Sequence, residues 1–120
     1  MSPVQDALRQ QLARHKELTI SVTGRKSGRT IAIPIWFVFE NEKLYLLPVQ
    51  GSDTQWYRNV LKKPSILIKS GSSVRELELK LITEAKQVAS VVEKFRDRYG
   101  AEDVKKYYSK FDVAVMGEIR

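Results

Sequence analysis

The segment from Leu18 to Phe39 constrains the fold of this chain more than any other. Residues 18–23 alternate apolar and hydroxyl side chains, and residues 31–39 form an apolar run of nine, and both patterns are typical of β-strands. Gly24 and Gly28 lie between the two runs and permit the positive φ values of a tight turn. Pro34 cannot donate to a sheet ladder, so we expect its strand to be bent or to lie at a sheet edge there. The segment predicts two strands joined by a short loop.

The rest of the chain adds four strands and four helical segments. Further strands are expected at Leu44–Val49, Ser65–Lys69, Val74–Thr83 and Asp112–Ile119. Helices are expected at Pro3–His15, from a start within residues 51–55 to a stop at Pro64, over Val88–Tyr99 with Gly100 at its end, and at Ala101–Ser109. A doubly wound α/β sheet requires regular strand–helix alternation, whereas these strands arrive in hairpin-like groups. We therefore predict a mainly β, α+β fold: a small, mostly antiparallel barrel of about six strands with helices packed on it.

Length and charge narrow the possible functions. A chain of 120 residues favours one domain over residues 1–120, with a helix near 3–15 and a barrel over 18–119. The formal charge of +7 favours an anionic partner: nucleic acid, acidic lipid or a phosphorylated small molecule. Without cysteine, and with His15 as the single histidine, the chain offers no disulfide, no thiolate nucleophile and no multi-histidine metal site. The sequence shows neither an export signal nor a membrane-spanning run, so we expect a cytoplasmic protein.

The loop Gly24–Arg29 is the sharpest candidate site. It places Arg25, Lys26 and Arg29 with the hydroxyl of Ser27 on a tight turn, and phosphate oxygens accept from side-chain and main-chain donors of this kind. A solvated basic turn is the alternative. Gly51-Ser52 offers a second anion site at a helix start, although capping of the helix by Ser52 explains the same residues.

Four segments, taken in order, resemble the deazaflavin-dependent nitroreductase family. They are Val22-Thr23-Gly24-Arg25-Lys26-Ser27-Gly28, Ile33-Pro34-Ile35-Trp36-Phe37-Val38, Lys43-Leu44-Tyr45-Leu46-Leu47 and Gln55-Trp56-Tyr57-Arg58-Asn59-Val60-Leu61-Lys62-Lys63-Pro64. The family belongs to the flavin and deazaflavin oxidoreductases with a split β-barrel, related to pyridoxamine-phosphate oxidases. The resemblance implies this split barrel and a pocket for coenzyme F420, a deazaflavin with a phosphate and an acidic glutamyl tail.

The resemblance also implies roles for individual residues. The loop residues Arg25, Lys26 and Ser27 match the family's phosphate or tail site, and Arg29 replaces an arginine that many members carry nearer Pro34. The strand residues Pro34, Ile35 and Trp36 match the edge along the tricyclic ring, and Val49, Gln50 and Gly51 match the next strand end facing the cofactor. Trp56 and Tyr57 match the aromatic pair beside the substrate cavity, and Tyr107 or Tyr108 would supply a proton. Gln50 stands where mycobacterial members have a lysine, which keeps FMN open as the cofactor.

These features support three functions. The first is an F420H2-dependent oxidoreductase that transfers a hydride to a quinone, a nitro compound or an activated enone, with the cofactor making the bonds and the protein binding and orienting. The second is an FMN-binding split barrel, either an oxidoreductase or a flavin carrier. The third is a small basic nucleic-acid-binding barrel, although its aromatic residues lie in apolar runs rather than among the cations. We expect a homodimer, no stable nucleic-acid complex and no metal.

Overall fold

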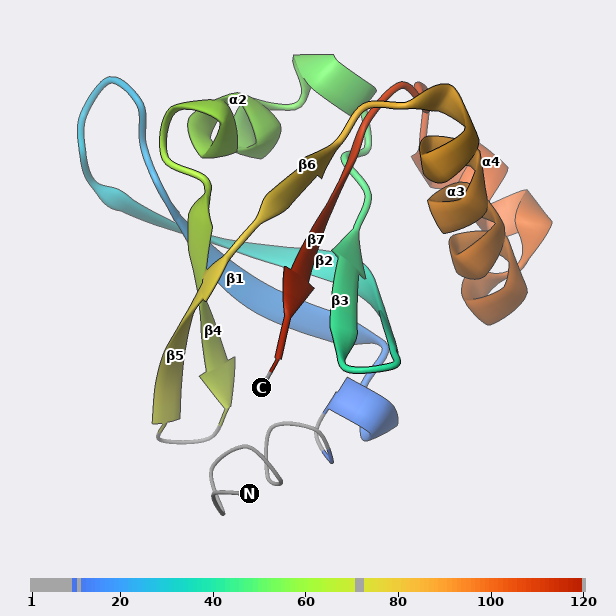
Figure 1. Ribbon diagram of the computed structural model, residues 1–120, viewed down its shortest axis with the longest axis horizontal. Helices are drawn as coiled ribbons and strands as arrows, with labels where there is room; N and C mark the ends of the chain where they lie inside the picture. Colours follow the sequence, from blue (N-terminus) through green and yellow to red (C-terminus); the bar gives the residue numbers. More distant parts are fainter. Residues whose placement is uncertain (1–9, 11, 71–72, 120) are drawn as a thin grey trace.

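The computed structural model describes residues 10, 12–70 and 73–119. Its strands form one antiparallel sheet in the order β5-β4-β1-β2-β3-β7-β6, curled into a nearly closed barrel (Figure 1). The strands are β1 Glu17–Thr23, β2 Thr30–Glu40, β3 Lys43–Leu46, β4 Ser65–Ser70, β5 Ser73–Glu78, β6 Lys80–Ile82 and β7 Ala114–Glu118. The helices are the 3-10 turn η1 Gly51–Asp53, α2 Gln55–Lys62, α3 Ala85–Tyr99 and α4 Ala101–Tyr107. The predicted small antiparallel barrel with flanking helices is confirmed.

Strand β2 is shared by the two halves of the barrel. Its residues 30–36 pair with β1, and its residues 37–40 pair with β3. Among the strands described, residues 30–36 therefore have a partner on one side only. The prediction of an edge at Pro34 is confirmed, since Pro34 lies opposite Thr19 of β1 within this singly paired stretch.

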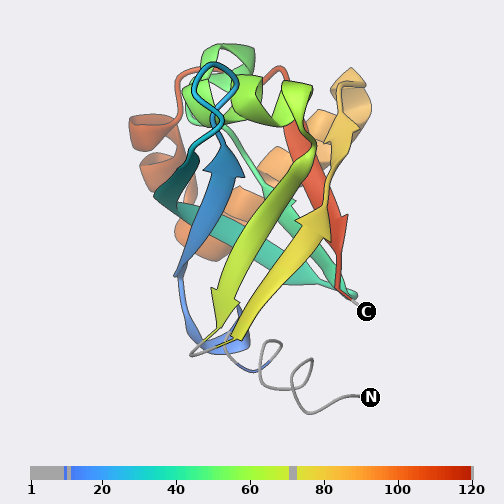
Figure 2. The same cartoon turned by 90° about the vertical axis from the view of Figure 1, so that its left-hand side faces the viewer.

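The barrel closes between β5 and β7 by side-chain packing. A Cβ on Gly117 of β7 would lie 2.4 Å from Cδ2 of Leu77 on β5, so only glycine lets the two strands approach this closely. The neighbouring strands β4 and β5 stand beside β1 on the opposite side of the barrel from α3 and α4 (Figure 2). The prediction of a single strand at residues 74–83 is wrong. The strand is interrupted at Leu79, whose N–H donates to the Pro64 carbonyl. Before this break β5 pairs with β4, and after it β6 pairs with β7.

Two groups of buried side chains hold these elements together. One collects buried residues from β1, β2, β3, β4, β5 and β7 with the inner face of α2, and fills the barrel. The other lies between α3, α4 and the outer face of the β2–β3–β7 half, where Val88, Val91, Val92 and Phe95 cover the sheet. The predicted helical face of residues 88–99 is confirmed. None of the helices in the described ranges is long and apolar enough to span a membrane.

Three predicted boundaries differ from the structure. The strand expected at 44–49 ends at Leu46, because the chain turns at Pro48. The helix expected from residue 51 begins as the 3-10 turn η1, and α2 follows with Thr54 as its N-cap, so Ser52 does not cap a helix here. Of the helix expected at Pro3–His15, residues 10 and 12–14 are helical, and most of the remainder lies outside the described residues.

Candidate functional site

The unpaired side of β2 carries main-chain groups that are available to a ligand. The Tyr99 Oη of α3 accepts from the Phe37 N–H (N–O 3.1 Å) and donates to the carbonyl oxygens of Phe37 (2.8 Å) and Lys16 (2.6 Å). Because Lys16 directly precedes β1, this hydroxyl continues the β1–β2 ladder at Phe37. Main-chain groups alternate in direction along an antiparallel strand, so those of Pro34 and Trp36 point away from β1. Pro34 lacks an N–H and loses no ladder bond in this position.

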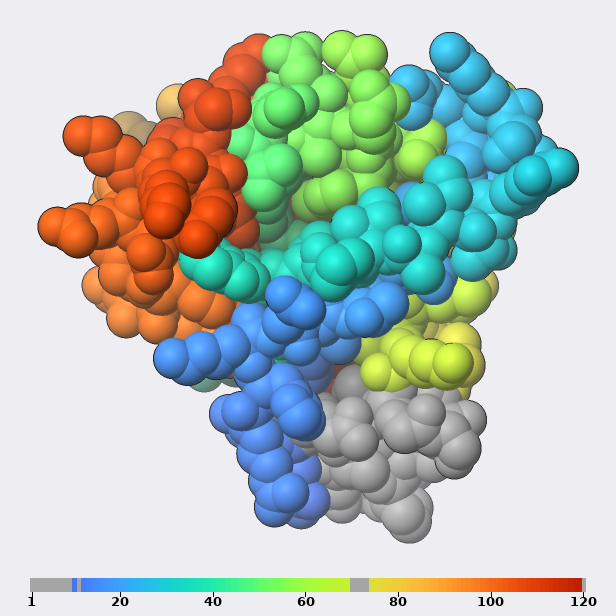
Figure 3. Space-filling model, turned by 180° about the vertical axis from the view of Figure 1, so that it is seen from behind, coloured from blue at the N-terminus to red at the C-terminus, as the bar shows by residue number. Residues whose placement is uncertain are grey.

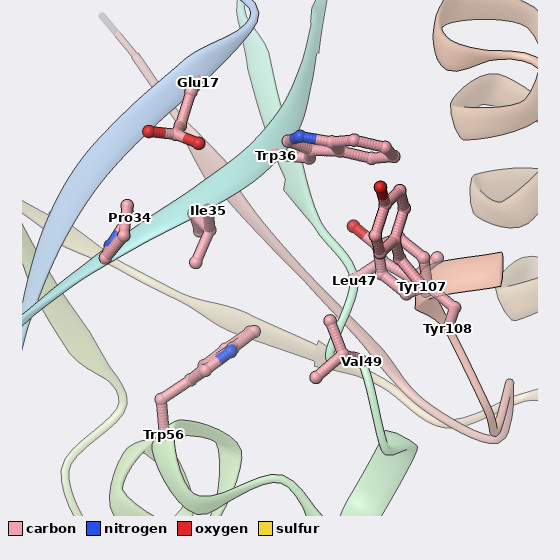
Figure 4. Close-up of a pocket in the computed structure, with 9 residues that line it drawn as sticks. All are labelled: Glu17, Pro34, Ile35, Trp36, Leu47, Val49, Trp56, Tyr107 and Tyr108. Carbon is pink, nitrogen blue, oxygen red and sulfur yellow. The ribbon is translucent and has the colours of Figure 1, made fainter. Parts of the chain in front are cut away.

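A cavity of about 380 Å³ opens beside this edge (Figure 4). Its wall consists of Glu17, Pro34, Ile35, Trp36, Leu47, Val49, Trp56, Tyr107 and Tyr108. The volume lies within the range of small-molecule sites, and the wall is mostly apolar and aromatic. The structure thus brings together seven of the residues predicted from the sequence: Pro34, Ile35, Trp36, Val49, Trp56, Tyr107 and Tyr108.

Trp36 packs against the helices while it lines the cavity. Its ring stacks on Tyr99 with centroids 4.3 Å apart and planes 8° from parallel, and the edge of Tyr107 meets it at 5.5 Å. Trp36 is therefore held by α3 and α4 and is only partly available to a ligand. The simple choice between a core residue and a cavity residue does not apply, because this ring packs against α3 and α4 and also lines the cavity.

The two candidate proton donors lie in different surroundings. Tyr108 is buried, and this burial raises its pKa well above the ordinary value of 10.0, with a further contribution from Tyr99. Its hydroxyl therefore keeps its proton more firmly than that of an ordinary tyrosine. Tyr107 is 54% exposed at the rim. Of the pair, Tyr107 is the one that lies open to water.

The neighbouring residue of Trp56 does not join the cavity. Tyr57 is buried in the barrel core, where burial and, to a smaller extent, Asp112 raise the pKa of its hydroxyl. Adjacent residues of a helix point about 100° apart, so Trp56 faces the cavity while Tyr57 faces inward. The two rings still meet edge to face, with centroids 6.4 Å apart, and both belong to the barrel core, so the structure keeps the pair together while Trp56 alone also lines the cavity.

Gln50 and Gly51 also serve the chain rather than the cavity wall. The Gln50 N–H donates to Thr54 Oγ1 (2.8 Å). Gly51 has φ +55°, and a Cβ there would lie 2.0 Å from Oδ1 of Asp112. That carboxylate accepts from the N–H of Ser52 (2.9 Å) and from its hydroxyl (2.5 Å). Ser52 is thus engaged in holding η1 to the segment before β7.

The β1–β2 loop is tied to α2 through Arg25. The Oδ1 of buried Asn59 accepts from the main-chain N–H of Arg25 (3.1 Å) and from its Nη1 (2.8 Å), and Gln55 Oε1 accepts from its Nη2 (2.9 Å). Lys62 Nζ in turn donates to the Arg25 carbonyl (3.2 Å). The guanidinium predicted to hold a phosphate is therefore occupied by protein partners.

A basic groove of about 570 Å³ lies between this loop and the end of α2. Its lining is Thr23, Gly24, Arg25, Lys26, Ser27, Gly28, Lys62 and Lys63. Lys26, Lys62 and Lys63 are exposed and bring three cations to one groove. Ser27 Oγ accepts from the Arg29 N–H (3.2 Å), while Arg29 is exposed and does not line the groove. Lys62 and Lys63 are site candidates that sequence reasoning missed, because the pair before Pro64 serves equally as a helix end.

Helix α2 borders both spaces, with Trp56 in the cavity and Lys62 in the groove. Figure 3 shows the face of the molecule on which β2 crosses below α2 and η1, with a hollow between them and the β1–β2 loop at one end.

Residues 9–114 match the family model described as an uncharacterized protein conserved in bacteria, DUF2255. The chain belongs to the DUF2255 family. No curated protein matches this DUF2255 sequence.

Solved structures share the fold of this DUF2255 protein. An F420-H2 dependent reductase, FDR-A, is 19% identical with a TM-score of 0.65, over 87% of this chain and 95% of its own. A chain described as a domain-swapped dimer is 20% identical with a TM-score of 0.67, over 98% and 100%. A putative pyridoxamine 5'-phosphate oxidase from Listeria innocua is 11% identical with a TM-score of 0.67, over 95% and 91%. The split β-barrel implied by the sequence resemblance is thereby confirmed as the fold.

Proposed function

We propose that this DUF2255 protein is an oxidoreductase that binds coenzyme F420, with FMN as the alternative, and reduces a quinone, a nitro compound or an activated enone. The observation that carries the proposal is an aromatic cavity at an unpaired strand edge, bordered by the same helix as a groove with three exposed lysines. Such a site suits a ligand with one flat apolar part and one anionic part. The same fold in an F420-H2 dependent reductase adds support.

The residues present fit a deazaflavin or flavin. Trp36 and Trp56 offer flat apolar walls for a ring system, and the outward main-chain groups of Pro34 and Trp36 offer hydrogen bonds to its polar edge. When bound, the group supplies the hydride chemistry. The chain then has to bind, orient and exclude water, which explains why no nucleophile or metal cluster is needed in the cavity.

Separate residues would hold the two parts of the ligand. Lys26, Lys62 and Lys63 would neutralise a phosphate or an acidic tail, and the main chain of the β1–β2 loop would add donors. Tyr107 at the rim would return a proton to the reduced acceptor, since its hydroxyl is open to water. Arg25 would act as a positioning residue that fixes the loop to α2.

Tryptophan fluorescence tests the proposal directly, because both tryptophans of the chain line the cavity. F420 and FMN are titrated into the apo protein, and quenching at micromolar ligand is expected. Lys62→Gln with Lys63→Gln should weaken binding of F420 about 10-fold or more, since charge-assisted contacts to an anion contribute about 1.5–3 kcal/mol each. Lys86→Gln on α3 removes a cation outside both spaces and serves as the control.

The outcome separates the alternatives. Tight binding of FMN with weak binding of F420 would identify a flavin protein, and binding without turnover of any acceptor would identify a carrier. Submicromolar binding of an oligonucleotide at 150 mM salt would favour the nucleic-acid function, because stable non-specific binding requires many phosphate contacts. Absence of binding by both F420 and FMN would refute the proposal.

We also propose a homodimer. A structural neighbour over the whole chain is described as a domain-swapped dimer, and split barrels offer an outer sheet face for association. Light scattering after size-exclusion chromatography tests this, with a mass of twice 13.8 kDa expected.

A further inference from the structure

One carboxylate lies in the otherwise mostly apolar wall of the cavity. Glu17 supplies the only carboxylate among the described residues that line the cavity. It lies opposite Trp36 in the β1–β2 ladder. This pair falls at a position where the main chain of Trp36 points away from β1, and cross-strand side chains are closest at such positions. Figure 4 shows Glu17 and Trp36 on the same side of the cavity.

Glu17 is exposed, and within the described part of the chain its carboxylate forms no ion pair or hydrogen bond. Exposed glutamates commonly serve solubility, but the chain as a whole carries a charge of +7, and the neighbouring groove is lined by cations. The two spaces beside α2 therefore present opposite charge, negative at the cavity and positive at the groove.

A carboxylate beside aromatic walls recognises a particular chemistry. The faces of tryptophan and tyrosine rings attract cations, and a flat cation also stacks on them. Trp36, Trp56 and Tyr107 supply such rings around the cavity that Glu17 lines. An anionic ligand would meet repulsion from Glu17 in the same place, whereas its anionic groups are favoured at the groove.

We propose that the cavity of this protein selects flat organic cations through Glu17 and rejects flat anions of the same size. This rests on the proposed function only for the role of such a cation, which would be a positively charged quinone, nitro compound or enone that accepts the hydride. The selection itself is a binding property of the apo protein. Glu17 is accordingly a specificity-determining residue, and it would also direct the anionic part of any cofactor toward the basic groove.

A matched set of three probes tests the selection. The probes are 1-methylnicotinamide, nicotinamide and nicotinate, which are a cation, a neutral molecule and an anion built on one ring. Their Kd values are measured by quenching of the two cavity tryptophans in the apo protein. A unit charge roughly 5 Å away in a water-like dielectric changes Kd about fourfold, so we expect the cation to bind about fourfold more tightly, and the anion about fourfold more weakly, than nicotinamide at low salt.

Variants assign the effect to one residue. Glu17→Gln keeps the shape and should bring the three Kd values within twofold of one another, while Glu17→Asp should keep their order. Glu76→Gln removes the same charge from β5, outside the cavity lining, and should keep the full spread. Glu17 is exposed, so melting temperatures close to the wild type are expected for its variants.

The results that overturn the proposal are distinct from those that overturn the proposed function. Equal or tighter binding of nicotinate than of 1-methylnicotinamide, a spread that persists in Glu17→Gln, or no binding of any probe would each refute cation selection. F420 binding alongside such a result would leave the proposed function standing. A clear charge order in a protein that binds neither F420 nor FMN would support cation selection and refute the proposed function.

Discussion

Substitution by alanine should affect different properties at two neighbouring cations of the β1–β2 loop, Arg25 and Lys26. Arg25 is bound to Asn59 and Gln55 of α2, whereas Lys26 is exposed in the basic groove. Arg25→Ala should therefore lower the stability of the protein, and Lys26→Ala should lower its affinity for an anionic ligand. The sequence alone treats the two as equivalent members of one anion site.

The loss of stability expected for Arg25→Ala follows from the contacts of the arginine side chain. A hydrogen bond to a charged group contributes about 1.5–3 kcal/mol, and the partly buried contact with Asn59 is one of these. The contact with Gln55 is exposed and adds little, and the Arg25 main-chain N–H still satisfies Asn59 in the variant. We expect a loss of about 1–2 kcal/mol in the free energy of unfolding. At about 0.25 kcal/mol per degree for a chain of this length, Tm should fall by about 4–8 °C.

Three further variants sharpen the assay, which pairs thermal unfolding with ligand titration. Arg25→Lys keeps the positive charge but cannot reach Asn59 and Gln55 together, so it should restore little of the lost Tm. Asn59→Ala should reproduce much of the stability loss, and the double variant with Arg25→Ala should be less destabilised than the sum, because the pair acts as one contact. Unchanged Tm in Arg25→Ala, with a large loss of anion affinity rescued by Arg25→Lys, would refute the reasoning and return Arg25 to the ligand.

Four other substitutions test three further features. Trp36→Leu should lower ligand affinity and also cost about 1–3 kcal/mol of stability, because it removes the stacked contact with α3, and a wild-type Tm would contradict this. Gly51→Ala should destabilise by about 2 kcal/mol or more in urea unfolding, since it combines a positive φ with a clash against Asp112, whereas Gly28→Ala has the positive φ but open space and should cost about 1 kcal/mol. Hydrogen bonds from Ser52 hold the pKa of Asp112 below its ordinary value of 3.8, so its contribution to stability is present above pH 3.8 and is lost as pH falls through the lower folded pKa. Asp112→Asn should therefore flatten the acid-side loss of stability in chemical unfolding, and an unaltered slope would show that Asp112 contributes nothing there.

The strand pattern predicted the barrel well because its signals are local. The alternation in residues 18–23 and the position of Pro34 each reflect one strand and its edge, and both are found in the structure. The break at Leu79 was not predicted, because the leucine alternation of residues 74–83 continues through it. That break depends on the Pro64 carbonyl and on the switch of partner strand, which are properties of the closed barrel.

The sequence predicted the residue types of the candidate site better than the role of each residue. Residue types suited to a flat anionic ligand were recognised, and Pro34, Trp36 and Trp56 meet at one cavity. The occupation of the Arg25 guanidinium by α2 was beyond reach, since its partners lie 30 and 34 residues away in sequence. For the same reason the pattern could not show that Glu17 lies beside Trp36.

Amide hydrogen exchange along the shared strand β2 reports two different properties of the protein. The N–H groups of Ile33 and Ile35 point toward β1, so their exchange requires the barrel to open, and its rate measures the stability of that opening. The N–H groups of Ala32 and Trp36 point the other way, toward the unpaired side, and exchange there without any unfolding. A ligand bound along this edge would slow exchange of the Ala32 and Trp36 N–H groups far more than its effect on global stability alone would. Alternate residues of a single strand thus record folding and occupancy independently, in one protein and one experiment.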